Sequence, residues 1–101
     1  MVARLSTYEG PSEEIDRMRD SFERLTDELR SLDGFEDAYL LIDRESGKAV
    51  TLTLWDNQSA LESSAERAGQ MREEVAGVAS HEIASVDSYE VRLHVGRLTD
   101  S

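Results

Sequence analysis

The sequence predicts a single α+β domain with the element order βαββαβ. Residues 2–9 and 86–95 alternate between two faces, which is the period of a β-strand. Residues 15–32 carry apolar side chains every three or four positions, which is the period of an amphipathic helix. Residues 35–43 and 48–55 are apolar runs on either side of a short polar turn, so they are expected to pair as a hairpin.

The first strand is expected to end at Gly10 and Pro11, and Ser12 is placed to cap the helix that follows. Gly34 is the expected C-terminal stop of that helix. The apolar stripe of the helix is the clearest signal in the chain. Its residues are Ile15, Met18, Phe22, Leu25, Leu29 and Leu32.

A second helix is predicted after the hairpin, with Asp56 as its cap. Its apolar face is narrow, and Gly69 is expected to divide it into two pieces. Residues 86–95 then form the last strand. The residues of the narrow face are Leu61, Ala65, Ala68, Met71, Val75 and Val78.

The order βαββαβ consists of two βαβ units, and two such units commonly form a four-stranded antiparallel sheet with both helices on one face. The other face of the sheet then has no cover. The third strand carries apolar residues on both sides, and residues 38–42 of the second strand are apolar throughout. An uncovered apolar sheet face is an association surface. We therefore expect a homodimer, with two-fold symmetry as its simplest form.

Composition narrows the classes of function. The 101 residues suffice for one domain, assigned to residues 1–95 with a frayed tail at 96–101. The formal net charge of −11 disfavours nucleic acids and anionic membranes as partners. The chain contains no cysteine and no apolar run of membrane-spanning length. Because the N-terminal residues lack the build of a signal peptide, we expect a cytoplasmic protein.

Residues 34–61 (GFEDAYLLIDRESGKAVTLTLWDNQSAL) and 84–93 (ASVDSYEVRL) resemble the antibiotic biosynthesis monooxygenase family. The most specific part is a strand that ends in Trp55, followed by Asp56 and the Ser-Ala-Leu start of a helix. The resemblance implies a ferredoxin-like fold that dimerises as an α+β barrel, with a pocket between helices and sheet in each subunit. It implies a cofactor-independent monooxygenase of a small aromatic or polyketide-like compound, and neither a cofactor nor a metal. The alternative is a non-catalytic ligand-binding or accessory protein on the same scaffold.

Relatives that degrade haem place an asparagine on the first strand, where this chain has Arg4 and Ser6 as polar residues. They also place a histidine on the helix after the tryptophan, whereas residues 56–78 contain none. Haem binding or degradation is therefore the less favoured function. No catalytic residue of this chain can be assigned from the resemblance.

Four residues are candidates for substrate binding: Trp55, Arg4, Tyr39 and Thr53. Trp55 matches the tryptophan that lines the pocket in relatives, although a tryptophan at a strand end also serves as core packing. Arg4 is suited to a ligand anion or enolate, but strand arginines are more often at a rim or in a salt bridge. Tyr39 offers a hydroxyl donor or interfacial packing, and Thr53 offers a hydroxyl with little bulk on the same strand face as Trp55.

Other polar residues give weaker signals. Tyr8 and Tyr89 have the same two interpretations as Tyr39. His81 and His94 are thirteen residues apart in a chain without cysteine, which is no zinc pattern. Each could serve as a general base, but a solvated histidine is the simpler interpretation.

Overall fold

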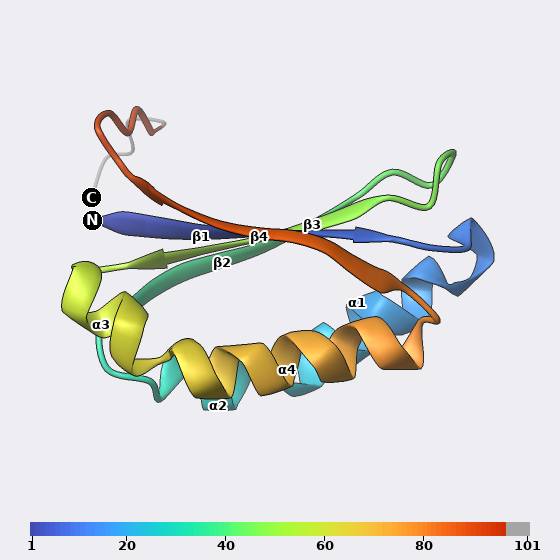
Figure 1. The fold of residues 1–101 in the computed structure, drawn as a ribbon, viewed down its shortest axis with the longest axis horizontal. Helices are drawn as coiled ribbons and strands as arrows, with labels where there is room; N and C mark the ends of the chain where they lie inside the picture. The colour runs from blue at the N-terminus through green and yellow to red at the C-terminus, as the bar shows by residue number, and fades with distance from the viewer. Residues whose placement is uncertain (97–101) are drawn as a thin grey trace.

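The computed structural model describes residues 1–96 as two layers, a four-stranded sheet and a layer of helices. The helices of residues 1–96 all lie on the same side of the sheet, and no helix of this part of the chain lies against the opposite side (Figure 1). The strand order is β2-β3-β1-β4. The predicted ferredoxin-like α+β fold is thus confirmed, while all but Gly96 of the predicted frayed tail lies outside the described residues.

The sheet is antiparallel throughout. β1 (Val2–Glu9) is flanked by β3 (Ala49–Trp55) and β4 (Glu82–Glu90), and β2 (Phe35–Ile42) pairs with the outer side of β3. Register places Arg4 opposite Thr53, so these two side chains share the helix-covered face. β1 and β3 therefore form the centre of the sheet, and β2 and β4 form its edges.

The first predicted helix is divided. A 3₁₀ turn (Ser12–Glu14) leads into α1 (Ile15–Arg24), and α2 (Thr26–Arg30) follows after Leu25. The Thr26 hydroxyl donates to the carbonyl oxygen of Glu23 at 2.8 Å, a side-chain bond that competes with regular helix geometry. The expected cap at Ser12 was wrong, because no side chain caps this start.

The second helix is also divided, but at a different residue from the one expected. α3 (Gln58–Ser63) and α4 (Ala65–Val78) meet at Ser64, whose hydroxyl donates to the Leu61 carbonyl at 2.9 Å. Gly69 lies inside α4 and does not break it. The cap is Asn57 rather than Asp56, since the Asn57 side chain accepts the N–H of Ala60 at 2.8 Å.

The last strand begins four residues earlier than predicted, at Glu82, and ends at Glu90 rather than at residue 95. The reason lies in its pairing with β1, which runs from Val2, opposite Glu90, to Glu9, opposite Glu82. His81, expected to be solvated, is instead 7% exposed. Its Nδ1 and Nε2 lie 2.6 Å and 2.8 Å from the carbonyl oxygens of Ala79 and Gly47. His94 is exposed, as expected.

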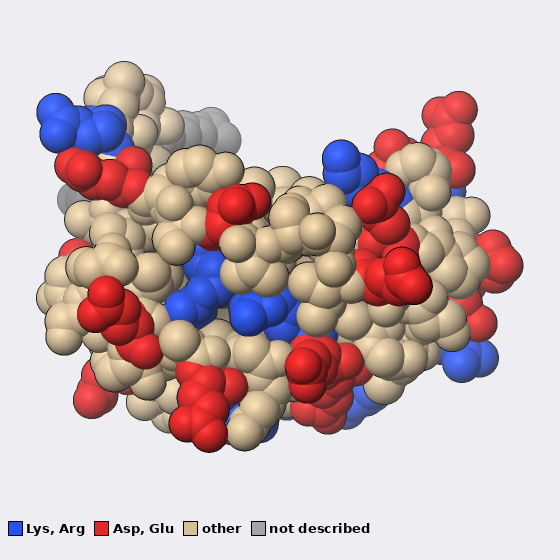
Figure 2. Space-filling view, in the orientation of Figure 1, with Lys and Arg blue, Asp and Glu red and all other residues tan. Residues whose placement is uncertain are grey.

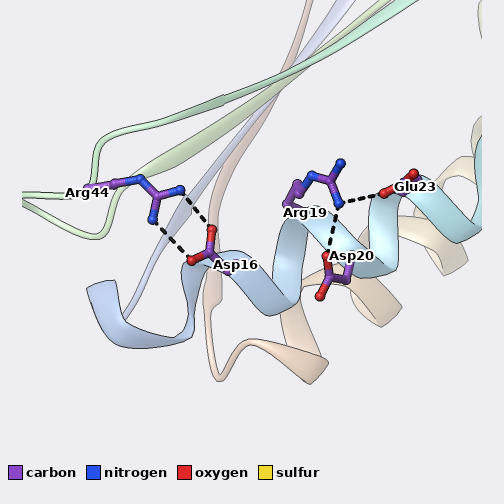
Figure 3. Close-up of polar contacts among 5 residues, drawn as sticks. All are labelled: Asp16, Arg19, Asp20, Glu23 and Arg44. Atoms are coloured by element: carbon purple, nitrogen blue, oxygen red, sulfur yellow. Dashed lines mark hydrogen bonds and ion pairs between the residues drawn. The ribbon is translucent and has the colours of Figure 1, made fainter.

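The turn between β2 and β3 packs against the end of β1. Gly47 has φ +81°, and a Cβ there would lie 2.1 Å from the carbonyl oxygen of Gly10. Only glycine fits both the backbone angle and the close approach. Arg44 in the same turn forms a two-point ion pair with Asp16 of α1, at 2.9 Å and 3.2 Å (Figure 3). The turn is thereby fixed to both layers.

Ion pairs also join residues of the helix layer. Arg67 of α4 bonds Glu28 of α2, and Arg19 of α1 contacts Asp20 and Glu23 (Figure 3). The charged groups of the Arg19 pairs are exposed, where each pair contributes little to stability. Within residues 1–96, no helix is long and apolar enough to cross a membrane.

Candidate functional site

A cavity of about 40 Å³ lies between the sheet and the helices. Its sheet wall is polar apart from Trp55, and its helix wall is apolar apart from Arg72. Figure 2 shows basic side-chain atoms deep in a hollow between the sheet and α4, surrounded by acidic side chains. The sheet residues that line it are Arg4, Ser6, Tyr8, Thr51, Thr53 and Trp55. The helix residues are Phe22, Leu25, Leu29, Ala68, Met71, Arg72 and Val75.

Trp55, the last residue of β3, is fully buried. Its indole N–H donates to the hydroxyl oxygen of Thr53 at 3.0 Å, and its ring meets the Phe35 ring edge-on with centroids 5.6 Å apart. A buried indole N–H needs such a partner. Trp55 therefore packs in the core and also lines the cavity, and its part in substrate binding stays a prediction.

Arg4, on the central strand, is only 8% exposed. Its Nη2 donates to the carbonyl oxygen of Leu61 at 2.7 Å, and its guanidinium carbon lies 5.6 Å from the centroid of the Trp55 ring. Leu61 is in the last turn of α3, where backbone carbonyls have no partner within the helix. Within residues 1–96, Nη1 has no hydrogen-bond partner, and no carboxylate pairs with the guanidinium.

The charge of Arg4 is consequently in an unfavourable environment. Burial lowers the pKa of its guanidinium, and the positive charge of Arg72 lowers it further. An arginine begins from so high a value that it stays protonated at neutral pH. The cavity thus holds a fixed positive charge with spare hydrogen-bond donors.

Tyr8 adds a hydroxyl to the sheet wall. Its oxygen lies 3.1 Å from the hydroxyl oxygen of Thr51, and the residue is 2% exposed. Burial raises the pKa of the Tyr8 phenol above its ordinary value, so the hydroxyl remains protonated at neutral pH. When Thr51 donates to the Tyr8 oxygen, the phenol proton can be donated to an oxygen atom in the cavity.

The cavity brings together three of the four residues that the sequence suggested for substrate binding: Trp55, Arg4 and Thr53. Tyr39 does not lie with them. It pairs with Leu52 on the opposite face of the sheet and is 50% exposed. Tyr89 lies on that face as well, since it pairs with Ala3 and is 55% exposed.

Arg72 was not among the residues chosen from the sequence. It lies on α4 one position after Met71 and three before Val75, so it borders the apolar stripe of that helix. This spacing is the signal that could have found it, because residues three or four apart on a helix share a face. Among residues 1–96, no group of three or more histidine or acidic side chains is arranged to hold a metal ion.

Comparison with solved structures shows the same fold in proteins of low sequence identity. The haem degrader MhuD of Mycobacterium tuberculosis, solved with two haems in its active site, is 19% identical, with a TM-score of 0.70. The match covers 95% of this chain and 100% of MhuD. At this identity the likeness concerns the fold alone.

Two oxygenases of Streptomyces are similar in the same way. SnoaB of Streptomyces nogalater, a cofactor-independent oxygenase, is 16% identical with a TM-score of 0.67, over 95% of this chain and 97% of SnoaB. The monooxygenase ActVA-Orf6 of Streptomyces coelicolor, solved with nanaomycin D, is 13% identical with a TM-score of 0.68, over 96% and 92% of the two chains.

No curated protein is similar enough in sequence to count as a match. The sequence model of the antibiotic biosynthesis monooxygenases, in contrast, matches residues 1–69, from β1 into α4. This is more than half of the chain, and it includes the central strands and Trp55. The protein belongs to the antibiotic biosynthesis monooxygenase family.

Proposed function

We propose that this protein is a homodimeric monooxygenase that uses no cofactor and acts on a small aromatic or polyketide-like compound. The observation that carries the proposal is the cavity beside Trp55, which combines an apolar helix wall with hydroxyl and guanidinium donors on the sheet. Apolar walls with a few convergent polar groups are typical of small-molecule sites. SnoaB and ActVA-Orf6, which have this fold, are oxygenases.

Such a reaction needs little chemistry from the protein. The substrate loses a proton from a CH₂ group next to an aromatic ring, and the electron pair left behind forms a C–O bond with dioxygen. Loss of water from the resulting hydroperoxide leaves a carbonyl group, so one CH₂ and one O₂ give one C=O and one H₂O. The protein's part is to exclude water, to orient the ring and to stabilise the developing negative charge. Arg4 and Tyr8 provide donors for that charge.

The cavity must enlarge to admit such a ligand. Its volume of about 40 Å³ holds only a few water molecules, whereas drug-sized ligands occupy sites of roughly 300–1,000 Å³. Phe22 and Leu25 line the helix wall and are only partly buried, and Leu25 lies at the junction of α1 and α2. We propose that these two side chains move when the ligand enters.

The uncovered face of the sheet supports a homodimer. Tyr39 and Leu41 on β2 are 50% and 53% exposed, and they adjoin Leu52 and Val50 on β3. β4 adds Tyr89 to the same face. A second copy that packs its own sheet against this surface would remove these side chains from water, and a two-fold dimer is the simplest way to do so.

The second candidate is a ligand-binding protein without catalysis. It is favoured by the composition of the cavity wall, which among the described residues contains no histidine, aspartate or glutamate. These side chains are the usual general bases. Without one, the substrate has to ionise by itself or with the help of positive charge.

Oxygen uptake separates the two candidates. The test compound is 1,8-dihydroxy-9-anthrone, which has a reactive CH₂ group and gives a coloured quinone. The monooxygenase proposal requires quinone formation and oxygen consumption in a 1:1 ratio, faster than with heat-denatured protein. Saturable quenching of Trp55 fluorescence without faster oxygen uptake would support the binding protein instead. If neither effect is observed, both candidates are wrong for this class of compound.

A further inference from the structure

We infer that the cavity binds its ligand as an anion, an aromatic compound whose negatively charged oxygen lies against Arg4 and Arg72. The inference rests on the proposed function, because it concerns the same cavity, and it adds the charge of the ligand. A carboxylate, an enolate and a phenolate share this chemistry.

The first argument is the state of Arg4. Its two contacts, with the Leu61 carbonyl and the Trp55 ring, are both with uncharged groups. A buried charge without a counter-ion is costly, and buried guanidinium groups are normally paired with carboxylates. Nη1 also has no acceptor within residues 1–96, although it is shielded from water. One oxyanion would supply both the counter-charge and the missing acceptor.

The second argument is the contrast with other arginines of the chain. The sequence has 22 acidic residues against 11 basic ones, so carboxylates are abundant. Within residues 1–96, seven arginines lie away from the cavity; six of them form an ion pair with a carboxylate, and the seventh, Arg24, is exposed to water. The six are Arg17, Arg19, Arg30, Arg44, Arg67 and Arg92.

The cavity carries positive charge, whereas its surroundings are acidic (Figure 2). Arg4 and Arg72 both line it, and neither forms an ion pair with any residue in the described part of the chain. None of the described lining residues is acidic. The protein therefore presents two positive charges inside a hollow whose surroundings are acidic (Figure 2). The local charge favours an anion over a neutral or cationic ligand of equal size.

The third argument defines the rest of the ligand. The helix wall contributes Phe22, Leu25, Leu29, Met71 and Val75, which offer apolar contact and no hydrogen bonds. Inorganic phosphate would leave this wall without a partner. A flat aromatic body on the apolar wall, with its oxygen toward the sheet, satisfies both sides of the cavity.

A matched pair of probes tests the charge. 2-Naphthoate is an anion at pH 7.5, and 2-naphthamide has nearly the same shape without the charge. We expect 2-naphthoate to bind at least about tenfold more tightly in titration calorimetry, because a charge-assisted hydrogen bond is stronger than a neutral one. Arg72→Gln should weaken 2-naphthoate binding about tenfold and leave 2-naphthamide nearly unchanged.

Arg24→Gln is the control, because it removes the same charge from an exposed position outside the cavity. It should leave both affinities as they are. Arg4→Gln should act like Arg72→Gln if it folds, and Arg72→Gln carries the test if it does not. Equal binding of the two probes to the unaltered protein would overturn the inference and leave the proposed pocket intact. Binding of neither probe would overturn the pocket itself, and the inference with it.

Discussion

The guanidinium group of Arg4 lies over the ring of Trp55, with 5.6 Å between the guanidinium carbon and the ring centroid. This contact joins the first strand to the end of the third strand inside the cavity. A cation above an indole ring is stabilised by the electron density of the ring, most of all where water is excluded. Trp55 therefore helps to hold a charge that no carboxylate in the described residues neutralises.

Trp55→Phe should weaken ligand binding more than it weakens folding. Phenylalanine keeps an apolar ring but loses the bond to Thr53 and part of the contact with Arg4. We expect a loss of about 1–2 kcal/mol in the free energy of unfolding. Binding of 2-naphthoate, measured by calorimetry because the variant has no tryptophan, should fall by a larger free energy. Tyr39→Phe, outside the cavity, is the control, and an equal loss of affinity there would contradict this assignment.

Leu52→Lys should dissociate the proposed dimer or unfold the chain. Leu52 lies on β3 between Tyr39 and Leu5, in the middle of the uncovered sheet face. A lysine there would be buried without a partner in the dimer. Sedimentation at micromolar concentration should give twice the 11.3 kDa chain mass for the unaltered protein and one chain mass for the variant. Ser59→Lys, on the exposed side of α3, should remain dimeric. An unaltered protein that sediments as one chain would contradict the dimer.

Gly47→Ala should destabilise the protein strongly. The residue has a positive φ, and the new methyl group would meet the carbonyl oxygen of Gly10. We expect a loss of about 2 kcal/mol or more in unfolding free energy, measured by urea denaturation. Gly77→Ala is the matched control, because its Cβ would meet nothing within 4 Å. Because Gly77 lies in the last turn of α4, that change should be close to neutral or stabilise by up to about 0.5 kcal/mol.

The protein should not bind haem tightly. His81 is buried with both ring nitrogens against carbonyl oxygens, so neither nitrogen is free to bind iron. His94, the other histidine, is exposed and lies outside the cavity. Mixing with an equimolar amount of haem should give no shifted Soret band in the absorption spectrum. A defined band that disappears in His94→Ala would reverse this conclusion.

Acidification should remove the contribution of the Asp16–Arg44 pair. The hydrogen bonds from Arg44 hold the pKa of the Asp16 carboxyl below its usual range. A carboxyl with a lowered pKa in the folded state stabilises at pH values above its unfolded pKa, and this effect is lost as the pH falls through the folded value.

Asp16→Asn should therefore lower the melting temperature at pH 7 by a small amount, because the pair is exposed. The difference from the unaltered protein should shrink below about pH 4. Asp33→Asn makes the same change of charge at an exposed residue that forms no ion pair within residues 1–96. An equal effect of both substitutions would show that the pair itself contributes nothing.

The periodicity of apolar residues predicted the fold because each helix and strand buries one face against the other layer. The apolar stripe from Ile15 to Leu29 and the alternation of residues 2–9 both correspond to side chains that face the space between the two layers. The interruptions were harder to predict, since each depends on a hydrogen bond. The Ser64 hydroxyl bonds the Leu61 carbonyl where α3 and α4 meet. Gly69, the obvious breaker in sequence, stays helical in a stretch of α4 whose Ala68 and Met71 are buried.

The candidate site was predictable only in part for a similar reason. Trp55, Arg4 and Thr53 share a strand face, and alternation places them together. Arg72 comes from a helix far along the chain, and its position opposite the sheet depends on how the layers pack. The burial of His81 and the exposure of Tyr39 were not predictable either. The exposure of a single side chain depends on neighbours from other elements, which a strand pattern does not contain.

The polar side of the cavity has a consequence for the stability of this protein. Arg4, Ser6 and Thr51 are buried at central strand positions where a sheet serving only as a scaffold would carry valine or isoleucine. Apolar replacements there would relieve the desolvation of buried polar groups and raise the melting temperature. The mutations that stabilise this fold most easily are thus the ones that remove the donors of the proposed binding site. Under the proposed function, the polar residues in the middle of this sheet are a trade-off in which ligand binding is gained at the expense of stability.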